Sequence, residues 1–376
     1  MAIERGPEHV RMTRAAIAAL LLSAIAASAE ATPNMIRLGY PTCASCHLSP
    51  QGGGLLTDYG KGIDAAQSLR PEEVKSSEDP GSYRRLPYDM KFSLGVDRNP
   101  PADSSYSFSS SIRTALAISH DQYIVYGLSV GSPTLLRTDT KAGGAVSLKM
   151  SRLYWMYQPK SGVSLTVGRD DLPSGIGSGG LAFARGTTSP NVSSTPTQAK
   201  IFLWNKRWQI AAYGFGPDGN ETAPRFEARG GGAVVGANVW KDRLVVGVTS
   251  RASYADAYDR KNAGLFMRLG LTEHWGALLE HDVTARTTAK PEHLTYVAGH
   301  SEIFFVPFDW LQTAIAAEDL VTIRGGHSYR FTPSASVRLN RNVGVSFSAR
   351  DVNTYTGVAT QRSRTYSVQV SVKTVE

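Results

Sequence analysis

Apolar and polar residues alternate one by one through much of the C-terminal three-quarters of this chain. From residue 343 onwards the apolar positions are Val343, Val345, Phe347 and Ala349, and the residues between them are Gly, Ser and Ser. The same alternation recurs over residues 327–340 and 364–374. Successive side chains of a β-strand point to opposite faces, so a period of two predicts strands with one apolar and one polar face.

Segments of this kind follow one another from Met90 onwards. They span residues 90–98, 105–119, 122–131, 143–158, 162–169, 198–206, 207–216, 227–241, 243–253, 261–273, 275–286, 294–309, 311–321, 327–340, 343–353 and 364–374. Alternating segments of about ten residues are typical of barrels that cross a membrane with strands, because one face meets lipid and the other a polar lumen. The pattern therefore predicts an all-β fold: a transmembrane antiparallel β-barrel of about 16 strands.

Connections of two kinds separate these segments. Seven short ones, at 119–122, 159–162, 205–206, 241–242, 272–273, 308–309 and 340–341, alternate with longer ones, of which residues 170–197 form the longest. Bacterial outer-membrane barrels have short periplasmic turns and longer external loops. All six tryptophans lie close to short connections, at positions 155, 204, 208, 240, 275 and 310. Indole rings favour the membrane interface, so we expect a periplasmic aromatic girdle, with both chain ends on that side.

The N-terminal residues predict an export signal. Arg11 and Arg14 precede an apolar run from Ala15 to Ala29, which is shorter than the roughly 20 residues that a spanning helix needs. Small residues at Ala29 and Ala31 predict cleavage there, so that residues 1–31 form a signal peptide. The net charge is +8, but the chain has no basic run. Together with export, this predicts outer-membrane lipid rather than nucleic acid as a partner.

The candidate chemistry lies directly behind this signal. The chain has two cysteines, and they form the motif Cys43-Ala44-Ser45-Cys46-His47, the C-x-x-C-H sequence of c-type haem attachment. In that chemistry the two thiols add to the vinyl groups of one haem, and the adjacent histidine becomes the proximal iron ligand. We therefore predict one covalent haem c bound by Cys43 and Cys46, with His47 as the proximal ligand.

Three other interpretations of the motif make different demands on the sequence. A structural disulfide would not need His47. A zinc site needs further ligands, and the next histidine along the chain is His120. A thioredoxin-like redox pair needs a βαβ context that this sequence does not show.

Residues 32–88 are the predicted haem segment, and residues 89–376 are the predicted barrel. The haem segment is too small for an independent core, so we expect it to pack against or inside the barrel. Leu55, Leu56 and Tyr59 are expected to cover the apolar face of the haem. The distal ligand is not evident, and the sequence offers four candidates for it: Met35, Met90, His120 and His300.

The order of signal peptide, single C-x-x-C-H, short Pro/Gly-rich segment and porin-like barrel resembles the fused monohaem cytochrome–porins of iron-oxidising bacteria. The resemblance covers the architecture of the mature chain, and its residues are Cys43, Cys46, His47, Pro50, Leu56-Thr57 and Tyr59-Gly60. The Gly52-Gly53-Gly54 run departs from the family pattern. The resemblance implies a haem segment that plugs or caps the barrel, and electron transfer across the outer membrane, in some members from external Fe(II).

Three functional hypotheses follow. The first is an outer-membrane electron conduit, a redox carrier rather than a conventional catalyst, between an extracellular redox partner and periplasmic cytochromes or other electron carriers. The second is a porin for solutes whose haem segment is a plug or sensor. Its candidate lumen charges are Arg268, Glu280, Asp282, Arg330, Arg338 and Arg350. The third is a haem enzyme such as a peroxidase, for which no distal His–Arg constellation is evident. The glycine-rich stretches lack the strand-to-helix context of a phosphate loop.

Overall fold

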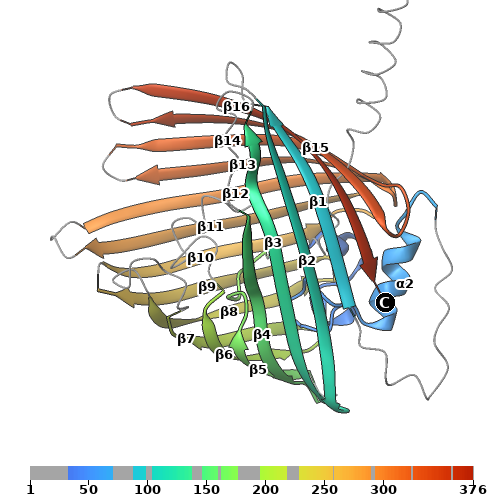
Figure 1. Cartoon of the computed structure of the whole chain (residues 1–376). Coiled ribbons are helices and arrows are strands. Elements are labelled where there is room, and N and C mark those ends of the chain that lie inside the picture. The colour runs from blue at the N-terminus through green and yellow to red at the C-terminus, as the bar shows by residue number, and fades with distance from the viewer. Residues whose placement is uncertain are drawn as a thin grey trace, which may run out of the picture.

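The computed structural model shows a closed antiparallel barrel of 16 strands, which confirms the predicted fold class (Figure 1). The structure describes residues 33–70, 88–98, 104–137, 146–159, 162–176, 195–217, 228–256, 258–288, 293–322, 325–356 and 359–375. The strands are β1 (Tyr88–Arg98), β2 (Ser104–Ser119), β3 (Gln122–Arg137), β4 (Ser147–Tyr157), β5 (Val163–Arg169), β6 (Thr197–Trp204), β7 (Trp208–Phe215), β8 (Arg229–Trp240), β9 (Leu244–Ala255), β10 (Tyr258–Gly270), β11 (Trp275–Thr288), β12 (His293–Phe308), β13 (Leu311–Thr322), β14 (His327–Arg338), β15 (Val343–Tyr355) and β16 (Thr360–Val375).

Each strand pairs with its neighbours in sequence, and β1 closes the barrel by pairing with β16. The alternating apolar and polar residues of each strand point to the outer and the inner face of the barrel wall in turn. Leu94, Leu265 and Ile315 are exposed on the outer surface, whereas Ser93, Arg268 and Glu318 are buried on the inner one. An apolar exterior around a polar interior is the arrangement suited to a lipid environment.

The predicted short connections are confirmed, and they all lie at one end of the barrel. We call this end the turn mouth, and the opposite end the far mouth. The described residues of the turn mouth are 120–121, 158–159, 162, 205–207, 241–243, 271–274, 309–310 and 339–342. The six tryptophans lie at the turn mouth, in or beside the ends of β4, β6, β7, β8, β11 and β13.

The expected alternation of short with long connections holds only in the first half of the chain. Residues 170–196 separate β5 from β6 on the far-mouth side, but only residues 256–257 separate β9 from β10. The reason is that pairing continues further than the sequence pattern suggests, because Tyr258 still pairs with Ala255. The prediction of longer loops at this position was therefore wrong.

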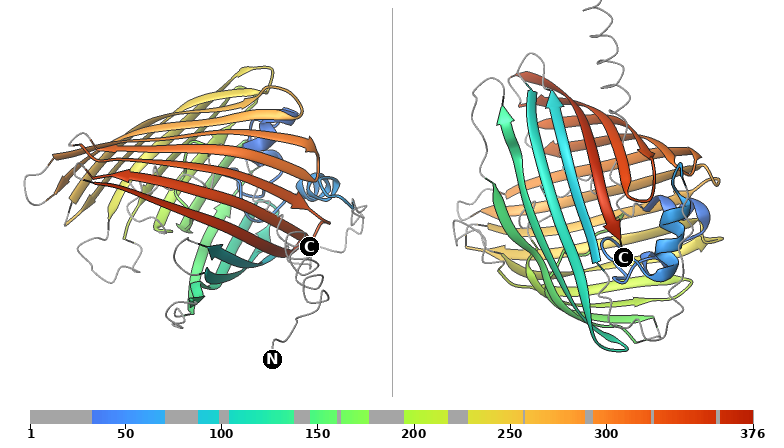
Figure 2. Two further views of the ribbon diagram at one scale, coloured as in Figure 1. Left: turned by 90° about the horizontal axis from the view of Figure 1, so that it is seen from above. Right: turned by 45° about the vertical axis from the view of Figure 1, so that its right-hand side comes forward.

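The N-terminal segment, residues 33–70, lies at and inside the turn mouth, beside the end of β16 (Figures 1 and 2). It contains two short 3-10 helices, η1 (Pro33–Leu38) and η2 (Cys43–Ser45), and the helix α2 (Asp58–Ala66). No helix among the described residues is long and apolar enough to cross a membrane. The predicted signal peptide, residues 1–31, lies outside the described residues.

Candidate functional site

The two cysteines and His47 share one tight turn. The backbone amides of Cys46 and His47 both donate to the carbonyl of Cys43, at 3.2 and 3.0 Å. Residues 46–48 then pair with residues 55–57: Leu48 N donates to Leu55 O, and Thr57 N donates to Cys46 O, each at 3.0 Å. The motif therefore consists of the short 3-10 helix η2 and the first arm of a small hairpin.

The glycine run forms the bend of this hairpin. Gly52, Gly53 and Gly54 have φ angles of +84°, +72° and +73°, the left-handed region that residues with a Cβ rarely adopt. A Cβ on Gly52 would also lie 2.9 Å from the Cys43 sulfur. The glycine run, which departs from the family pattern, is thus explained by the shape of the bend. All three residues need a positive φ, and the backbone of Gly52 lies against the Cys43 side chain.

Helix α2 packs onto the other side of the motif. The Thr57 hydroxyl caps the helix by accepting from Gly60 N at 3.1 Å. Gly60 lies so close to the Cys46 carbonyl that a Cβ there would overlap its oxygen. Thr57 and Gly60, the second members of the Leu-Thr and Tyr-Gly pairs, therefore have structural roles as the cap and the contact point of α2.

The reactive groups are sheltered. The two thiols are not joined in a disulfide, and both cysteines are half-buried. Burial raises the pKa of the Cys43 thiol, and the nearby guanidinium of Arg268 opposes this. Burial also lowers the pKa of His47 to about 4, so its ring is neutral at pH 7, the form that binds a metal ion. The carbonyls of Gly54 and Leu55 lie near the ring, but His47 Nδ1 makes no hydrogen bond with them.

Apolar contacts seat the segment in the barrel. Leu55 is buried in a cluster with Ala115, Val125, Tyr154 and Met156, from the inner faces of β2, β3 and β4. On the opposite wall Ile36 packs into a second cluster that includes Phe266 and Phe304. Of the residues expected to cover a haem, Leu55 is therefore buried. Leu56 is partly buried, and Tyr59 is half exposed and lies against Tyr40, so a covering role for these two residues stays a prediction.

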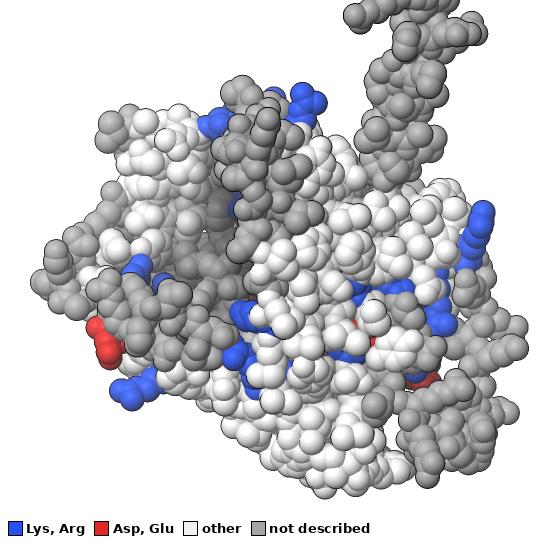
Figure 3. Space-filling view, in the orientation of Figure 1, with Lys and Arg blue, Asp and Glu red and all other residues white. Residues whose placement is uncertain are grey.

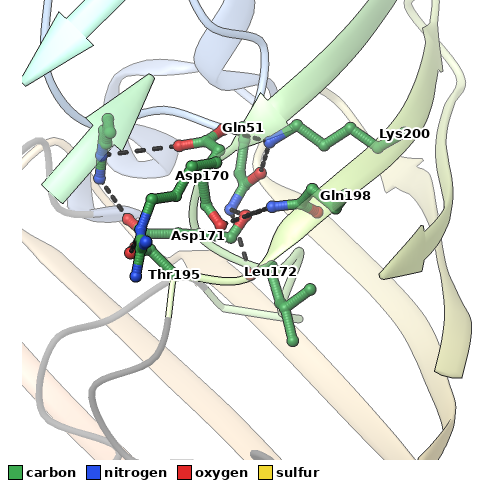
Figure 4. A network of polar contacts seen from close by, with 9 residues as sticks. Gln51, Asp170, Asp171, Leu172, Thr195, Gln198 and Lys200 are labelled. Carbon is green, nitrogen blue, oxygen red and sulfur yellow. Dashed lines mark hydrogen bonds and ion pairs between the residues drawn. The ribbon is translucent and has the colours of Figure 1, made fainter. Parts of the chain in front are cut away.

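A polar network ties the segment to the wall and to residues 170–172, which follow β5 (Figure 4). Gln51 Nε2 donates to the carbonyls of Asp171 and Leu172 at 3.3 and 3.2 Å. Lys200 of β6 donates to Gln51 Oε1 at 2.7 Å and also pairs with Asp170. Lys200 and Asp170 are both buried, and a buried charge is stable only when it is paired in this way.

A third anchor lies at the turn mouth. Lys373 Nζ of β16 donates to both carboxylate oxygens of Asp64 in α2, at 2.8 and 2.6 Å, and Arg338 of β14 pairs with the same group. Leu69 N donates to the Arg338 carbonyl at 2.8 Å. Arg37 bonds to the Glu273 carbonyl. The segment thus contacts the wall on several sides, as the sequence predicted in general terms.

The four candidates for a distal ligand lie in different places. Met90 points outward from β1 and is exposed, and His120 is in an exposed turn beside Asp121. His300 is buried in β12, with Glu302 and Glu318 at 3.5 and 3.7 Å from its ring nitrogens. Met35 lies on the N-terminal segment, and its sulfur accepts from Gln67 Nε2 at 3.4 Å. Met90 thus lies on the outer face of the wall, and His120 lies in the exposed turn between β2 and β3.

The predicted lumen charges do lie on the inner face. All six occupy strand positions that face the lumen: Arg268, Glu280, Asp282, Arg330, Arg338 and Arg350. The sequence analysis missed Gln51, Asp64 and Lys200, whose roles depend on contacts across the barrel. Within the described ranges no group of three or more His, Cys, Asp and Glu side chains is arranged to hold a metal ion.

Comparison with known proteins supports the fold alone. No family profile and no curated protein matches the sequence. Among solved structures, the barrel resembles OmpT with loop L8 deleted, an outer membrane protein of Vibrio cholerae. The TM-score is 0.58 at 8% identity, over 77% of this chain and 99% of that one. It also resembles an anion-selective porin from Comamonas acidovorans, with a TM-score of 0.58 at 10% identity over 77% of this chain and 99% of that one. Salmonella typhi OmpF in complex with daunomycin gives a TM-score of 0.57 at 11% identity, over 77% of this chain and 97% of that one. The chain therefore has the fold of a 16-stranded outer-membrane porin.

Proposed function

We propose that this protein is an outer-membrane electron conduit, in which the barrel encloses an N-terminal segment that carries one covalent c-type haem. The turn mouth would face the periplasm and the far mouth the outside. The observation that carries the proposal is the position of the C-x-x-C-H turn. It lies within a barrel of porin fold, between the wall at Arg268 and the bend at Gly52.

The residues around the motif fit such a group. Two unlinked thiols and a neutral, buried imidazole lie within one turn, as haem attachment requires. His47 is buried, with its ring beside the backbone carbonyls of Gly54 and Leu55. Leu55 and its apolar neighbours exclude water on one side.

Each part of the chain has a separate task in this proposal. Cys43 and Cys46 would hold the haem through thioether bonds, and His47 would bind its iron. The bound haem would supply one-electron exchange between ferrous and ferric iron. The barrel wall fixes the segment through Asp64, Gln51 and Ile36, and periplasmic cytochromes or other carriers would meet it at the turn mouth.

The proposal predicts a c-type spectrum in the outer membrane. When the full chain is expressed with c-type maturation, we expect one covalent haem per chain in a heat-modifiable barrel, measured by reduced-minus-oxidised optical spectra and haem staining. Cys43→Ala/Cys46→Ala should abolish the covalent haem, and His47→Ala should change the iron coordination, while both variants still form barrels. A folded wild-type barrel that carries no covalent haem after maturation would refute the proposal.

A solute porin is the second candidate, favoured by the number of charged side chains on the inner face, such as Arg268, Glu280 and Asp282. The same purified sample separates the two functions, because a solute porin conducts ions steadily in a planar bilayer. A conduit whose lumen is filled by the segment at the turn mouth does not.

A further inference from the structure

A buried arginine of β10 lies against the C-x-x-C-H turn. Arg268 is on the inner face of the wall and is 5% exposed, and its guanidinium contacts the Cys43 thiol. Gly270 is the next residue on the same face towards the turn mouth, and a Cβ there would lie 2.5 Å from the Ile36 carbonyl oxygen. The N-terminal segment is therefore packed directly onto β10 at this point, which fixes Arg268 beside Cys43.

The wall around Arg268 is apolar. In register, Arg268 lies between Val245 of β9 and Leu278 of β11, and both of these are 2% exposed. Its guanidinium carbon is 5.7 Å from the centre of the Phe266 ring. All three neighbours belong to the buried cluster that also contains Ile36. A charge in such surroundings acts through a low effective dielectric constant, so its effect on a neighbouring group is stronger than at the surface.

The positive charge of Arg268 is only partly balanced by other side chains. Glu280 of β11 attracts it, but among the described residues no carboxylate forms a direct ion pair with it. Two other basic residues beside the N-terminal segment differ in this respect, because Lys200 and Arg152 each form an ion pair with Asp170. Arg268 therefore retains more of its positive field than Lys200 or Arg152 does.

Burial also protects this field from the solvent. The basic side chains that are visible on the face shown in Figure 3 reach the surface, where water and dissolved salt screen their charges. Arg268 is enclosed by the wall and by the N-terminal segment, so screening is much weaker there. The field of Arg268 at Cys43 should accordingly depend little on ionic strength.

We propose that Arg268 raises the reduction potential of the haem attached at Cys43, an inference that rests on the function proposed above. Reduction adds one electron to the attached group, and a fixed cation beside that group stabilises its more negative form. Arginine stays protonated in proteins, and the sulfur of a thioether is uncharged, so no anion arises at Cys43 to cancel the field. With Arg268 in place, the segment accepts electrons from weaker reductants than it would without this residue.

Redox titration of the haem-loaded full chain against reference dyes measures this effect. Arg268→Met and Arg268→Gln remove the charge, and each should shift the equilibrium towards the ferric form by roughly tenfold, which is about 59 mV for one electron. Arg268→Lys keeps the charge and should stay close to the wild type. The difference between the wild type and Arg268→Met should change little when salt is added.

The matched control is Arg330→Gln, which removes the same charge from the inner face of β14. Arg330 pairs with Glu318 at 2.8 Å, and β11, β12 and β13 separate its strand from β10. This variant should keep the wild-type potential, and a heat-modifiability assay shows that each variant forms a barrel. If only one of the two uncharged Arg268 variants forms a barrel, that variant decides the test. An unchanged potential without the Arg268 charge, or an equal shift in Arg268→Lys or in Arg330→Gln, overturns the proposal.

A second measurement detects the same field without haem. In a Cys46→Ala background, the Cys43 thiol is cyanylated before the full chain is folded in detergent, and the infrared stretching frequency of the nitrile reports the local electric field. Arg268→Met should shift this frequency, whereas Arg268→Lys and Arg330→Gln should leave it close to that of the parent protein. A nitrile that does not respond to Arg268→Met overturns the proposed field at Cys43. If the chain carries no covalent haem after maturation, the electron-conduit function fails, and the nitrile result still decides whether Arg268 acts on Cys43.

Discussion

Two glycines of α2 stand two residues apart in very different surroundings. Gly60 lies against the backbone of Cys46, where there is no room for a Cβ, whereas nothing lies within 4 Å of the position a Cβ would take on Gly62. Both residues are helical, so any intrinsic gain in helix propensity from alanine applies to both. A comparison of the two alanine variants therefore isolates the contact between α2 and the cysteine turn.

Gly60→Ala should loosen the N-terminal segment, because overpacking against a fixed backbone costs on the order of 1–3 kcal/mol. Gly62→Ala should leave the segment as it is, or stabilise α2 by about 0.5–1 kcal/mol. Limited proteolysis of the folded barrel in detergent measures the difference as the rate of cleavage within residues 33–70. Equal cleavage rates for the two variants would show that α2 does not depend on the contact with Cys46.

At the scale of elements, α2 is attached to the barrel by one carboxylate. Burial alone would raise the pKa of Asp64, but Lys373 and Arg338 outweigh it and hold that pKa below its usual value. An acid whose pKa is lowered by folding stabilises the folded form fully above its unfolded pKa, near 4. The stabilisation is lost as the pH falls from there through the lower folded value.

We therefore expect α2 to stay docked at neutral pH and to detach below about pH 4. A spin label at Asp58→Cys, in a Cys43→Ala/Cys46→Ala background, reports this as increased mobility, because the Asp58 side chain is exposed. Adding Asp64→Asn should give the mobile spectrum at every pH. Adding Asp121→Asn, which alters a turn where Asp121 pairs with His120, should not. If the label were already mobile at pH 7 in the protein that retains Asp64, α2 would not be held against the barrel by this carboxylate.

The elements themselves were largely predictable from the sequence, and the way they hold the segment was not. The alternation of apolar and polar residues that predicts a strand can be seen in a few neighbouring positions, such as Val343, Val345 and Phe347. The short turns are predicted where this alternation is interrupted. The anchor of α2 joins Asp64 to Lys373, 309 residues away in the chain. Neither residue belongs to a motif, and a lysine in an alternating strand is indistinguishable from any other polar lumen residue.

The whole molecule is a barrel with an apolar outer surface and a polar inner surface. Two neighbouring residues of β15 lie on different surfaces. Phe347 faces outward and is 37% exposed, whereas Ser346 belongs to the inner face. Arginine on a lipid-facing position near mid-membrane costs about 2–4 kcal/mol, whereas lumen positions accept polar side chains.

Phe347→Arg should accordingly destabilise the barrel by about 2–4 kcal/mol in lipid vesicles, and Ser346→Arg should have a much smaller effect. Urea titration of the folded barrel in vesicles, followed by tryptophan fluorescence, measures both. If Ser346→Arg were the more destabilising variant, the assignment of inner and outer faces along β15 would be reversed.

The contacts that seat the N-terminal segment also set the order in which the protein can mature. The chain between the predicted signal peptide and β1 is too small for an independent hydrophobic core. Its partners include Ala115 near the start of the barrel and Lys373 near its end. It therefore reaches its final conformation only after the last strand has joined the first. Until then Cys43, Cys46 and His47 belong to a mobile chain that is open to modifying enzymes, and completion of the barrel ends that access.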